Sequence, residues 1–204
     1  MRPLELIHNN FIVGLEYLNF FKDSSFVKHI EISNVEISDF TLPKFNDNGN
    51  FVGGSTAFRE EYENKVQKSL KGITNPCLYM FELISPDVQT VFETYTEFAN
   101  KQEEIKGKVK RSYSSINNTY SRKQIKPQIL YVGKSEKPID GRIVVHFGYY
   151  EKGVAGLQLV YWGKDINLKV NVHVFELINN EMHPYLETLE KLFFAQLKPI
   201  IGKR

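Results

Sequence analysis

The strongest constraint on the fold is the segment LKVNVHVFELI at residues 168–178, where three valines occupy alternate positions. A period of two places these valines on one face of a β-strand. Two shorter segments, CLYMFELI at 77–84 and QILYVGK at 128–134, are also rich in strand-forming residues and too short for most helices. Together the three segments predict a small sheet in a domain that mixes strands and helices.

Amphipathic segments around these strands predict helices. Apolar residues recur at helical spacing between Ser55 and Gly72. They recur again from Pro86, with Ser85 as the expected N-cap, to Ile105. The remaining helices are predicted at 140–150, 154–162 and 184–198.

Composition favours a folded protein with a sizeable core. The 204 residues include 15 Phe and 11 Tyr, which excludes disorder along most of the chain, and the single cysteine excludes a disulfide framework. No apolar run reaches the length of a membrane span, and the first residues lack the pattern of a signal peptide. We therefore expect a soluble, cytoplasmic protein with no membrane partner. Residues 1–72 are predicted to form an N-terminal accessory region, in which 27–37 fits a strand, and residues 73–204 the main domain.

Seven basic residues and no acidic residue lie between Lys106 and Lys126, although the net charge of the chain is only +2. Ser, Asn and Thr residues are interspersed among them, together with Tyr113 and Tyr120. Lys and Arg neutralise phosphates, and hydroxyl and amide groups hydrogen-bond phosphate oxygens, so this composition suits DNA; a solvated surface loop is the alternative. The candidate DNA-binding residues are Lys106, Lys108, Lys110, Arg111, Arg122, Lys123 and Lys126.

Two of the predicted strands carry tyrosines, Tyr79 and Tyr131, which are either packing residues or part of a site. Gly133 and Lys134 follow the second tyrosine closely. A glycine at the end of a strand permits close approach of a ligand to the backbone, and a lysine just after it can bind a phosphate.

Three further residues are candidates for chemistry. Arg142 and His146 are four residues apart, which places them on one face of a predicted helix. Facing a phosphate, they would supply a permanent cation and a titratable imidazole; the alternative is two ordinary surface residues. Glu190 falls within the apolar stripe of the last predicted helix, where a carboxylate needs a partner or a hard cation such as Mg²⁺. A partly exposed glutamate at the edge of that stripe is the alternative.

The two tyrosine segments resemble the signatures of a GIY-YIG nuclease. Cys77-Leu78-Tyr79 stands where that family has Gly-Ile-Tyr, and Tyr131-Val132-Gly133 stands for Tyr-Ile-Gly, with Lys134 directly after it. The resemblance covers about residues 73–204. It implies an α+β fold in which helices flank a small three-stranded antiparallel sheet.

The order and spacing of the other candidates strengthen the resemblance. Arg142 lies eleven residues after Tyr131, and His146 lies four after Arg142, as in the family pattern. Glu190, followed by Phe193-Phe194, matches the glutamate of the terminal helix that binds the metal.

Three departures from the family pattern stand out. Cys77 and Leu78 replace the first two residues of the Gly-Ile-Tyr signature. Residues 85–127 form an insertion between the two signatures, predicted as a helix followed by the basic loop. Gly202 occupies the position where the family commonly has an asparagine.

The resemblance implies phosphodiester hydrolysis with one metal ion. Either tyrosine is the general base on the attacking water, Lys134 and Arg142 favour its phenolate, and His146 accepts its proton. Mg²⁺, for which Mn²⁺ can substitute, stabilises the leaving 3′ oxygen as a Lewis acid. The implied catalytic residues are Tyr79, Tyr131, Lys134, Arg142, His146 and Glu190, and Glu190 is also the metal ligand.

These inferences predict a Mg²⁺-dependent endonuclease that acts on DNA, in the manner of a stand-alone restriction enzyme. Cleavage of both strands would suit a homodimer. One alternative is a repair or recombination nuclease that a partner protein targets. The other is a nucleic-acid-binding module with a degenerate catalytic centre.

Overall fold

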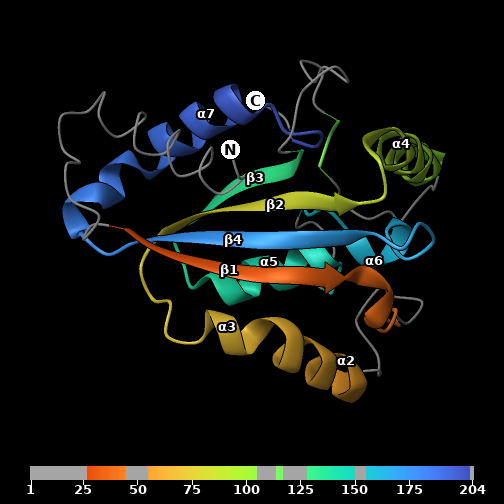
Figure 1. The fold of residues 1–204 in the computed structure, drawn as a ribbon, viewed down its shortest axis with the longest axis horizontal. Helices are drawn as coiled ribbons and strands as arrows, with labels where there is room; N and C mark the ends of the chain where they lie inside the picture. The colour runs from red at the N-terminus through yellow and green to blue at the C-terminus, as the bar shows by residue number, and fades with distance from the viewer. Residues whose placement is uncertain (1–26, 45–54, 105–113, 117–127, 150–154, 203–204) are drawn as a thin grey trace.

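The computed structural model describes residues 27–44, 55–104, 114–116, 128–149 and 155–202. Within them, four antiparallel strands form one sheet in the order β1-β4-β2-β3 (Figure 1). The chain is therefore α+β, as predicted, but its sheet has four strands where the sequence predicted three. The strands are β1 (Val27–Glu36), β2 (Cys77–Ser85), β3 (Ile129–Ser135) and β4 (Lys169–Leu177).

The additional strand is β1, which lies within the region predicted to be accessory. It pairs with β4 along its length, so the edge of β4 that a three-stranded sheet would leave open is covered. The register shifts between Ile32 and Val35, and Asn34 between them has a φ of 55°, in the left-handed region. This irregularity breaks the alternation of buried residues and makes the strand pattern weaker in the sequence. The division at residue 72 stays a prediction about domain organisation.

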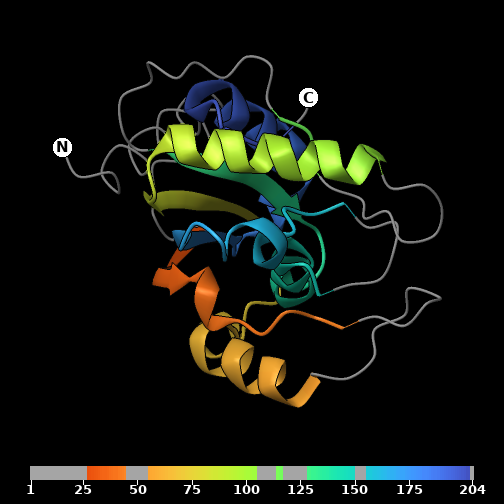
Figure 2. The same ribbon diagram turned by 90° about the vertical axis from the view of Figure 1, so that its right-hand side faces the viewer.

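Helices cover both faces of the sheet (Figure 2). On one face, Tyr79 and Val174 belong to a hydrophobic cluster with residues of α2, α4, α5 and α6. On the other face, Leu78 and Phe175 pack with residues of α7. The helices are α2 (Ser55–Tyr62), η3 (Glu63–Gln67), α3 (Lys68–Leu70), α4 (Val88–Glu104), α5 (Ile139–Phe147), α6 (Leu159–Trp162) and α7 (Leu186–Leu197), with short 3-10 turns η2 (Ile37–Asp39) and η4 (Asn180–Tyr185).

Four of the predicted helices are present, with changes at their ends. Of the helix predicted at 154–162, only Leu159–Trp162 is helical, and residues 155–158 are not. Helix α4 begins at Val88, after Pro86, and the side chain at its N-terminus is Asp87, which accepts hydrogen bonds from the backbone and hydroxyl of Thr90. Ser85 is therefore not the cap; it is the last residue of β2. The final α-helix begins at Leu186 rather than at the predicted Pro184, because Pro184 belongs to the 3-10 turn η4 that precedes the helix. Within the described residues, no helix is long and apolar enough to cross a membrane.

Candidate active site

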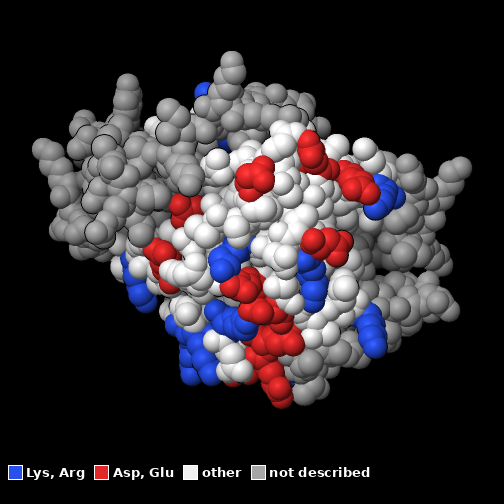
Figure 3. Space-filling view, turned by 45° about the vertical axis from the view of Figure 1, so that its right-hand side comes forward, with Lys and Arg blue, Asp and Glu red and all other residues white. Residues whose placement is uncertain are grey.

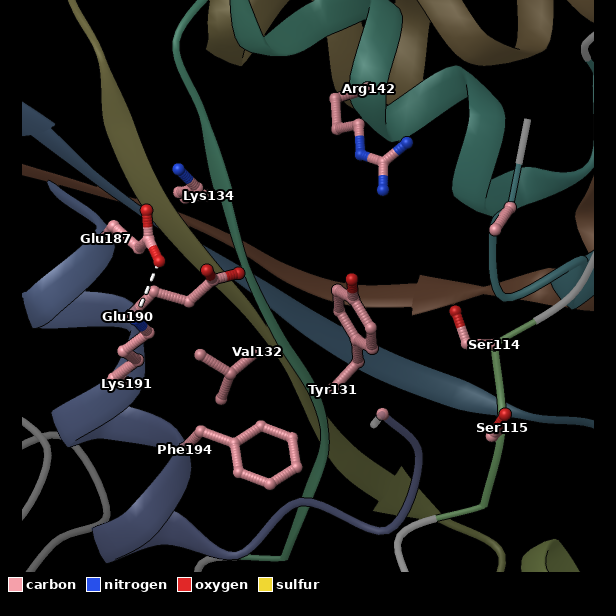
Figure 4. Close-up of a pocket in the computed structure, with 12 residues that line it drawn as sticks. Ser114, Ser115, Tyr131, Val132, Lys134, Arg142, Glu187, Glu190, Lys191 and Phe194 are labelled. Carbon is pink, nitrogen blue, oxygen red and sulfur yellow. Dashed lines mark ion pairs between the residues drawn. The ribbon is translucent and has the colours of Figure 1, made fainter. Parts of the chain in front are cut away.

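A cavity of about 640 Å³ lies at the edge strand β3, between β3, α5 and α7 (Figure 4). Tyr131 and Lys134 reach it from β3, Arg142 from α5 and Glu190 from α7. Because β3 is the edge strand, α5 on one face of the sheet and α7 on the other can both contribute to the same space. The structure therefore brings four of the six predicted catalytic residues into one cavity.

Tyr79 lies beside Tyr131 in the protein interior, and Gly133 makes room for it. Tyr79 is fully buried and pairs with Gly133 across β2 and β3. A Cβ atom at residue 133 would lie 2.5 Å from the Tyr79 hydroxyl oxygen and 2.7 Å from Cε1 of Tyr131. Only glycine fits beneath the two rings without displacing them, which gives the glycine of this segment a packing reason.

His146 is the sixth predicted residue, and it is fully buried against Tyr79. Its Nε2 lies 2.7 Å from the Tyr79 hydroxyl oxygen, and its Nδ1 accepts a hydrogen bond from the backbone N–H of Leu157 at 3.3 Å. Burial, together with the charge of Arg142, lowers the pKa of His146 well below its ordinary value. The neutral ring therefore carries its proton on Nε2, and this N–H donates a hydrogen bond to the Tyr79 hydroxyl oxygen. This arrangement is the reverse of the expected one, in which His146 accepts the tyrosine's proton.

The hydroxyl of Tyr79 links His146 and Arg142 to Tyr131. Arg142 Nε donates to the Tyr79 oxygen at 3.2 Å, and the Tyr79 and Tyr131 hydroxyls are hydrogen-bonded to each other. Arg142 is also hydrogen-bonded to Tyr131. Since the Tyr79 oxygen already accepts two hydrogen bonds, its own proton points to the Tyr131 oxygen. The chain of donors therefore ends at Tyr131, which lines the cavity, whereas Tyr79 does not reach it.

Both tyrosines are phenols rather than phenolates in this environment. Burial raises the pKa of Tyr79 well above its ordinary value, although the charge and hydrogen bond of Arg142 oppose the shift. Burial likewise raises the pKa of Tyr131; Arg142 lowers it, and the negative charge of Glu190 raises it. The predicted favouring of a phenolate by Arg142 thus acts in the expected direction, but burial outweighs it.

Lys134 lies at the rim of the cavity with its ammonium group 3.0 Å from a carboxylate oxygen of Glu136. That hydrogen bond raises the pKa of Lys134, and the charges of Glu187 and Glu190 add to the effect. Lys134 therefore stays charged, with acidic groups on both sides.

Glu190 is half-buried on α7, at the edge of the apolar stripe formed by Leu189 and Phe193 rather than inside it. Its side chain extends into the cavity, while Glu187 one turn earlier is paired with Lys191 at 2.6 Å (Figure 4). Carboxylate oxygens are ligands that Mg²⁺ prefers, and Mg²⁺ commonly takes one or two of them beside water and substrate oxygens. Glu190 fits such a role. Among the described residues, no group of three or more His, Cys, Asp or Glu side chains is arranged to hold a metal ion.

The wall opposite Glu190 comes from residues that no sequence pattern placed in the site. Ser114 and Ser115 line it, although they belong to the predicted insertion (Figure 4). They are held by backbone hydrogen bonds from Ser114 N to the Gly156 oxygen at 3.1 Å and from Gly202 N to the Ser115 oxygen at 2.8 Å. No local pattern signals these long-range pairs.

Gly202 lines the cavity too, with a φ of 135° that strongly favours glycine. A Cβ there would lie 2.8 Å from Cε2 of Phe194. The ring of Phe194 therefore takes the space that an asparagine at this position would need.

All seven candidate DNA-binding residues of the basic segment lie outside the described residues. Figure 3 shows acidic side chains among the basic ones on the face it presents, where the described residues form no continuous basic surface.

No protein-family model, curated protein or solved structure matches this chain. The resemblance to GIY-YIG nucleases therefore stays a prediction from the residues themselves.

Proposed function

We propose that this protein is a Mg²⁺-dependent endonuclease of the GIY-YIG type that hydrolyses phosphodiester bonds in DNA. The observation that carries the proposal is the convergence at one cavity. Arg142, Lys134 and Tyr131 line it with Glu190, and the hydroxyl of Tyr79 connects Arg142 to His146 behind it. A guanidinium, an ammonium, a phenol and a carboxylate in one cavity match the needs of phosphoryl chemistry.

Tyr131 is the better candidate for the general base, because it lines the cavity and Tyr79 is buried behind it. In the proposed step, Tyr131 first gives its proton to solvent, and the phenolate that forms takes a proton from the attacking water while the water oxygen bonds to phosphorus. The bond from phosphorus to the 3′ oxygen breaks, and that oxygen takes a proton from solvent. Hydrogen bonds from Tyr79 and Arg142 stabilise the phenolate, and Arg142 also faces the oxygens on which charge develops.

Glu190 would hold the Mg²⁺ ion, which supplies Lewis-acid stabilisation of the leaving oxygen when it is bound. His146 then has a positioning role: its Nε2–H and the Leu157 N–H at Nδ1 fix the orientation of the Tyr79 hydroxyl. This role replaces the proton acceptance expected from the sequence.

A second candidate function is a nucleic-acid-binding module without catalysis. Gly202 favours it, because the Phe194 ring excludes the asparagine side chain that the family commonly has there. The predicted catalytic residues that lie together at and behind the cavity favour catalysis. Binding alone does not require a pair of tyrosines linked to a buried, neutral histidine.

The test is cleavage of supercoiled plasmid and linear phage DNA with Mg²⁺, with Mn²⁺, and with EDTA. Glu190→Gln keeps the size of the side chain and removes its charge, so we expect it to abolish cleavage while DNA binding persists. Glu60→Gln is the matched control, because Glu60 is an exposed residue of α2 outside the cavity.

The products distinguish the candidates. Discrete fragments point to a restriction enzyme, and a dimer in sedimentation velocity would then account for cleavage of both strands. Nicking or smearing that Glu190→Gln abolishes points to a nuclease that a partner targets in repair or recombination. Binding without cleavage by the native chain would replace the nuclease with the binding module.

A further inference from the structure

A second cavity, of about 550 Å³, adjoins the candidate active site and shares Lys134 and Arg142 with it. It lies over the connection from β3 to α5, and Lys137 and Gly141 also line it. The two spaces therefore meet at the two cations that face the proposed scissile phosphate. A substrate held by these cations would either end at them or extend from the first cavity into the second.

The charges of the second cavity suit an anion. Lys134, Lys137 and Arg142 line it, and the one carboxylate among its lining residues is Glu136, whose oxygen is 3.0 Å from the Lys134 ammonium group. Lys137 is exposed, and its backbone oxygen accepts a hydrogen bond from the Ser135 hydroxyl at 2.7 Å, which fixes the turn that carries it. The balance of charge is positive.

The same cavity also offers apolar surface. Pro138 and Val145 line it beside the cations. Apolar surface next to positive charge suits a nucleotide, in which a sugar and base accompany each phosphate. A free inorganic anion has no apolar group that could contact this part of the cavity.

We infer that the second cavity is a subsite for the phosphate and sugar that flank the scissile phosphodiester, with Lys137 as its phosphate-binding residue. This inference rests on the proposed function and extends it. The substrate is then a polynucleotide strand that runs through both cavities, and a diester without flanking phosphates lacks the contacts of the second cavity.

Gly141 provides a way to block the subsite without disturbing the core. A Cβ built at Gly141 meets no heavy atom within 4 Å, and the residue lies in the first turn of α5. Gly141→Glu would place a negative charge in the second cavity, and Gly141→Gln is the neutral side chain of nearly the same size. A larger loss of DNA binding in Gly141→Glu than in Gly141→Gln would separate charge from bulk.

The experiment measures DNA affinity by fluorescence anisotropy over a range of salt concentrations, in the Glu190→Gln background that blocks cleavage. One phosphate contact contributes about 0.9 to the salt slope, so we expect Lys137→Ala to reduce the slope by about one and affinity near 0.1 M salt by about five- to tenfold. Lys28→Ala is the matched control, because Lys28 is exposed on β1, at the opposite edge of the sheet. Unchanged affinity and slope in both Lys137→Ala and Gly141→Glu would overturn the inference.

A second readout separates the subsite from a general structural role. Lys137→Ala should raise KM for DNA more than it lowers hydrolysis of bis(p-nitrophenyl) phosphate, a small diester without flanking phosphates, while Lys28→Ala should change neither. Equal losses on both substrates would contradict the subsite. If native protein cleaves and Glu190→Gln does not, but Lys137→Ala matches the native chain throughout, the proposed function stands and the subsite fails. If native protein binds DNA without cleaving it, the nuclease proposal fails and the binding data still decide the subsite.

Discussion

Two buried histidines lie on opposite faces of the same sheet, and their hydrogen-bond networks differ in where they end. His146 packs against Tyr79, and His173 pairs in register with Met80, the next residue of β2, so its side chain points to the other face. His173 Nε2 lies 3.1 Å from Glu82 Oε2, and its Nδ1 lies 3.3 Å from His29 Nε2.

The network around His173 ends at His29, an exposed residue of β1, and its residues line neither of the two cavities described above. Glu82 also accepts a hydrogen bond from Asn171 at 3.1 Å, and these bonds outweigh burial and lower the pKa of Glu82. Each group thus has a partner within the cluster, as expected for a histidine in a valine-rich strand. The network around His146 instead passes through Tyr79 to Tyr131, whose hydroxyl lies at a cavity. A buried histidine with good partners is therefore not evidence of chemistry by itself; a network that ends at a cavity is the stronger indication.

The largest effect is expected where the His146 network meets the cavity. Tyr131→Phe should lower the rate of DNA cleavage by about 10²- to 10⁴-fold, the usual contribution of a general base. Tyr79→Phe is the matched change at the buried tyrosine beside Tyr131, which does not line the cavity. It should reduce the rate less, and it should lower the free energy of unfolding by about 1–3 kcal/mol, because the buried His146 and the half-buried Arg142 lose their acceptor. Single-turnover cleavage and urea denaturation measure the two effects, and the reverse order of rates would make Tyr79 the base.

A substitution at Gly133 tests whether the packing of the Tyr79 and Tyr131 rings requires a residue without a side chain at this position. Gly133→Ala should lower the free energy of unfolding by about 1–3 kcal/mol through overpacking, and should reduce cleavage by displacing the tyrosines. Gly141→Ala is the control, since its Cβ meets open space and alanine suits a helix better; it should raise stability by about 0.5–1 kcal/mol. Equal stabilities of the two variants in urea denaturation would show that Gly133 is not required for packing.

The network around His173 should affect stability alone. His173→Leu removes a donor from Glu82, which is 6% exposed, and should lower the free energy of unfolding by about 1–3 kcal/mol. Cleavage under conditions where the variant stays folded should match the native rate. A selective loss of cleavage, with folding intact by circular dichroism, would mean that the two faces are coupled.

The pH dependence of stability should separate the two networks. His146 has a pKa below its ordinary 6.5 in the folded protein, so the unfolded chain binds more protons and stability falls as pH drops below about 6.5, by up to about 1.4 kcal/mol per pH unit. Glu82 also has a lowered pKa, and its stabilising contribution is lost only below its ordinary 4.5. Urea denaturation of His146→Gln between pH 7.5 and 5.5 should show a smaller slope than the native chain. An unchanged slope would assign the loss to other groups.

Much of the fold could be predicted from local patterns. Alternating valines predict β4, the helical spacing from Phe58 to Leu70 predicts the helix that begins as α2, and all four apolar residues of that spacing are buried. The strand β1 was harder to assign to the sheet, because its bulge interrupts the alternation and its partner β4 lies more than 130 residues later. Strand pairing at such a distance leaves no local trace in the sequence.

For the candidate site, the sequence provided the residue types and their order, and from these the six predicted residues. Three things were decided by tertiary structure alone: which tyrosine reaches the cavity, which nitrogen of His146 carries the proton, and which residues form the opposite wall. The first depends on the depth of each ring, the second on a hydrogen bond from Leu157, and the third on backbone pairs with Ser114 and Ser115. The physical reason is common to all three. Local patterns record which face a residue takes on its own strand or helix, whereas access, protonation and cavity walls depend on contacts between elements that are distant in the chain.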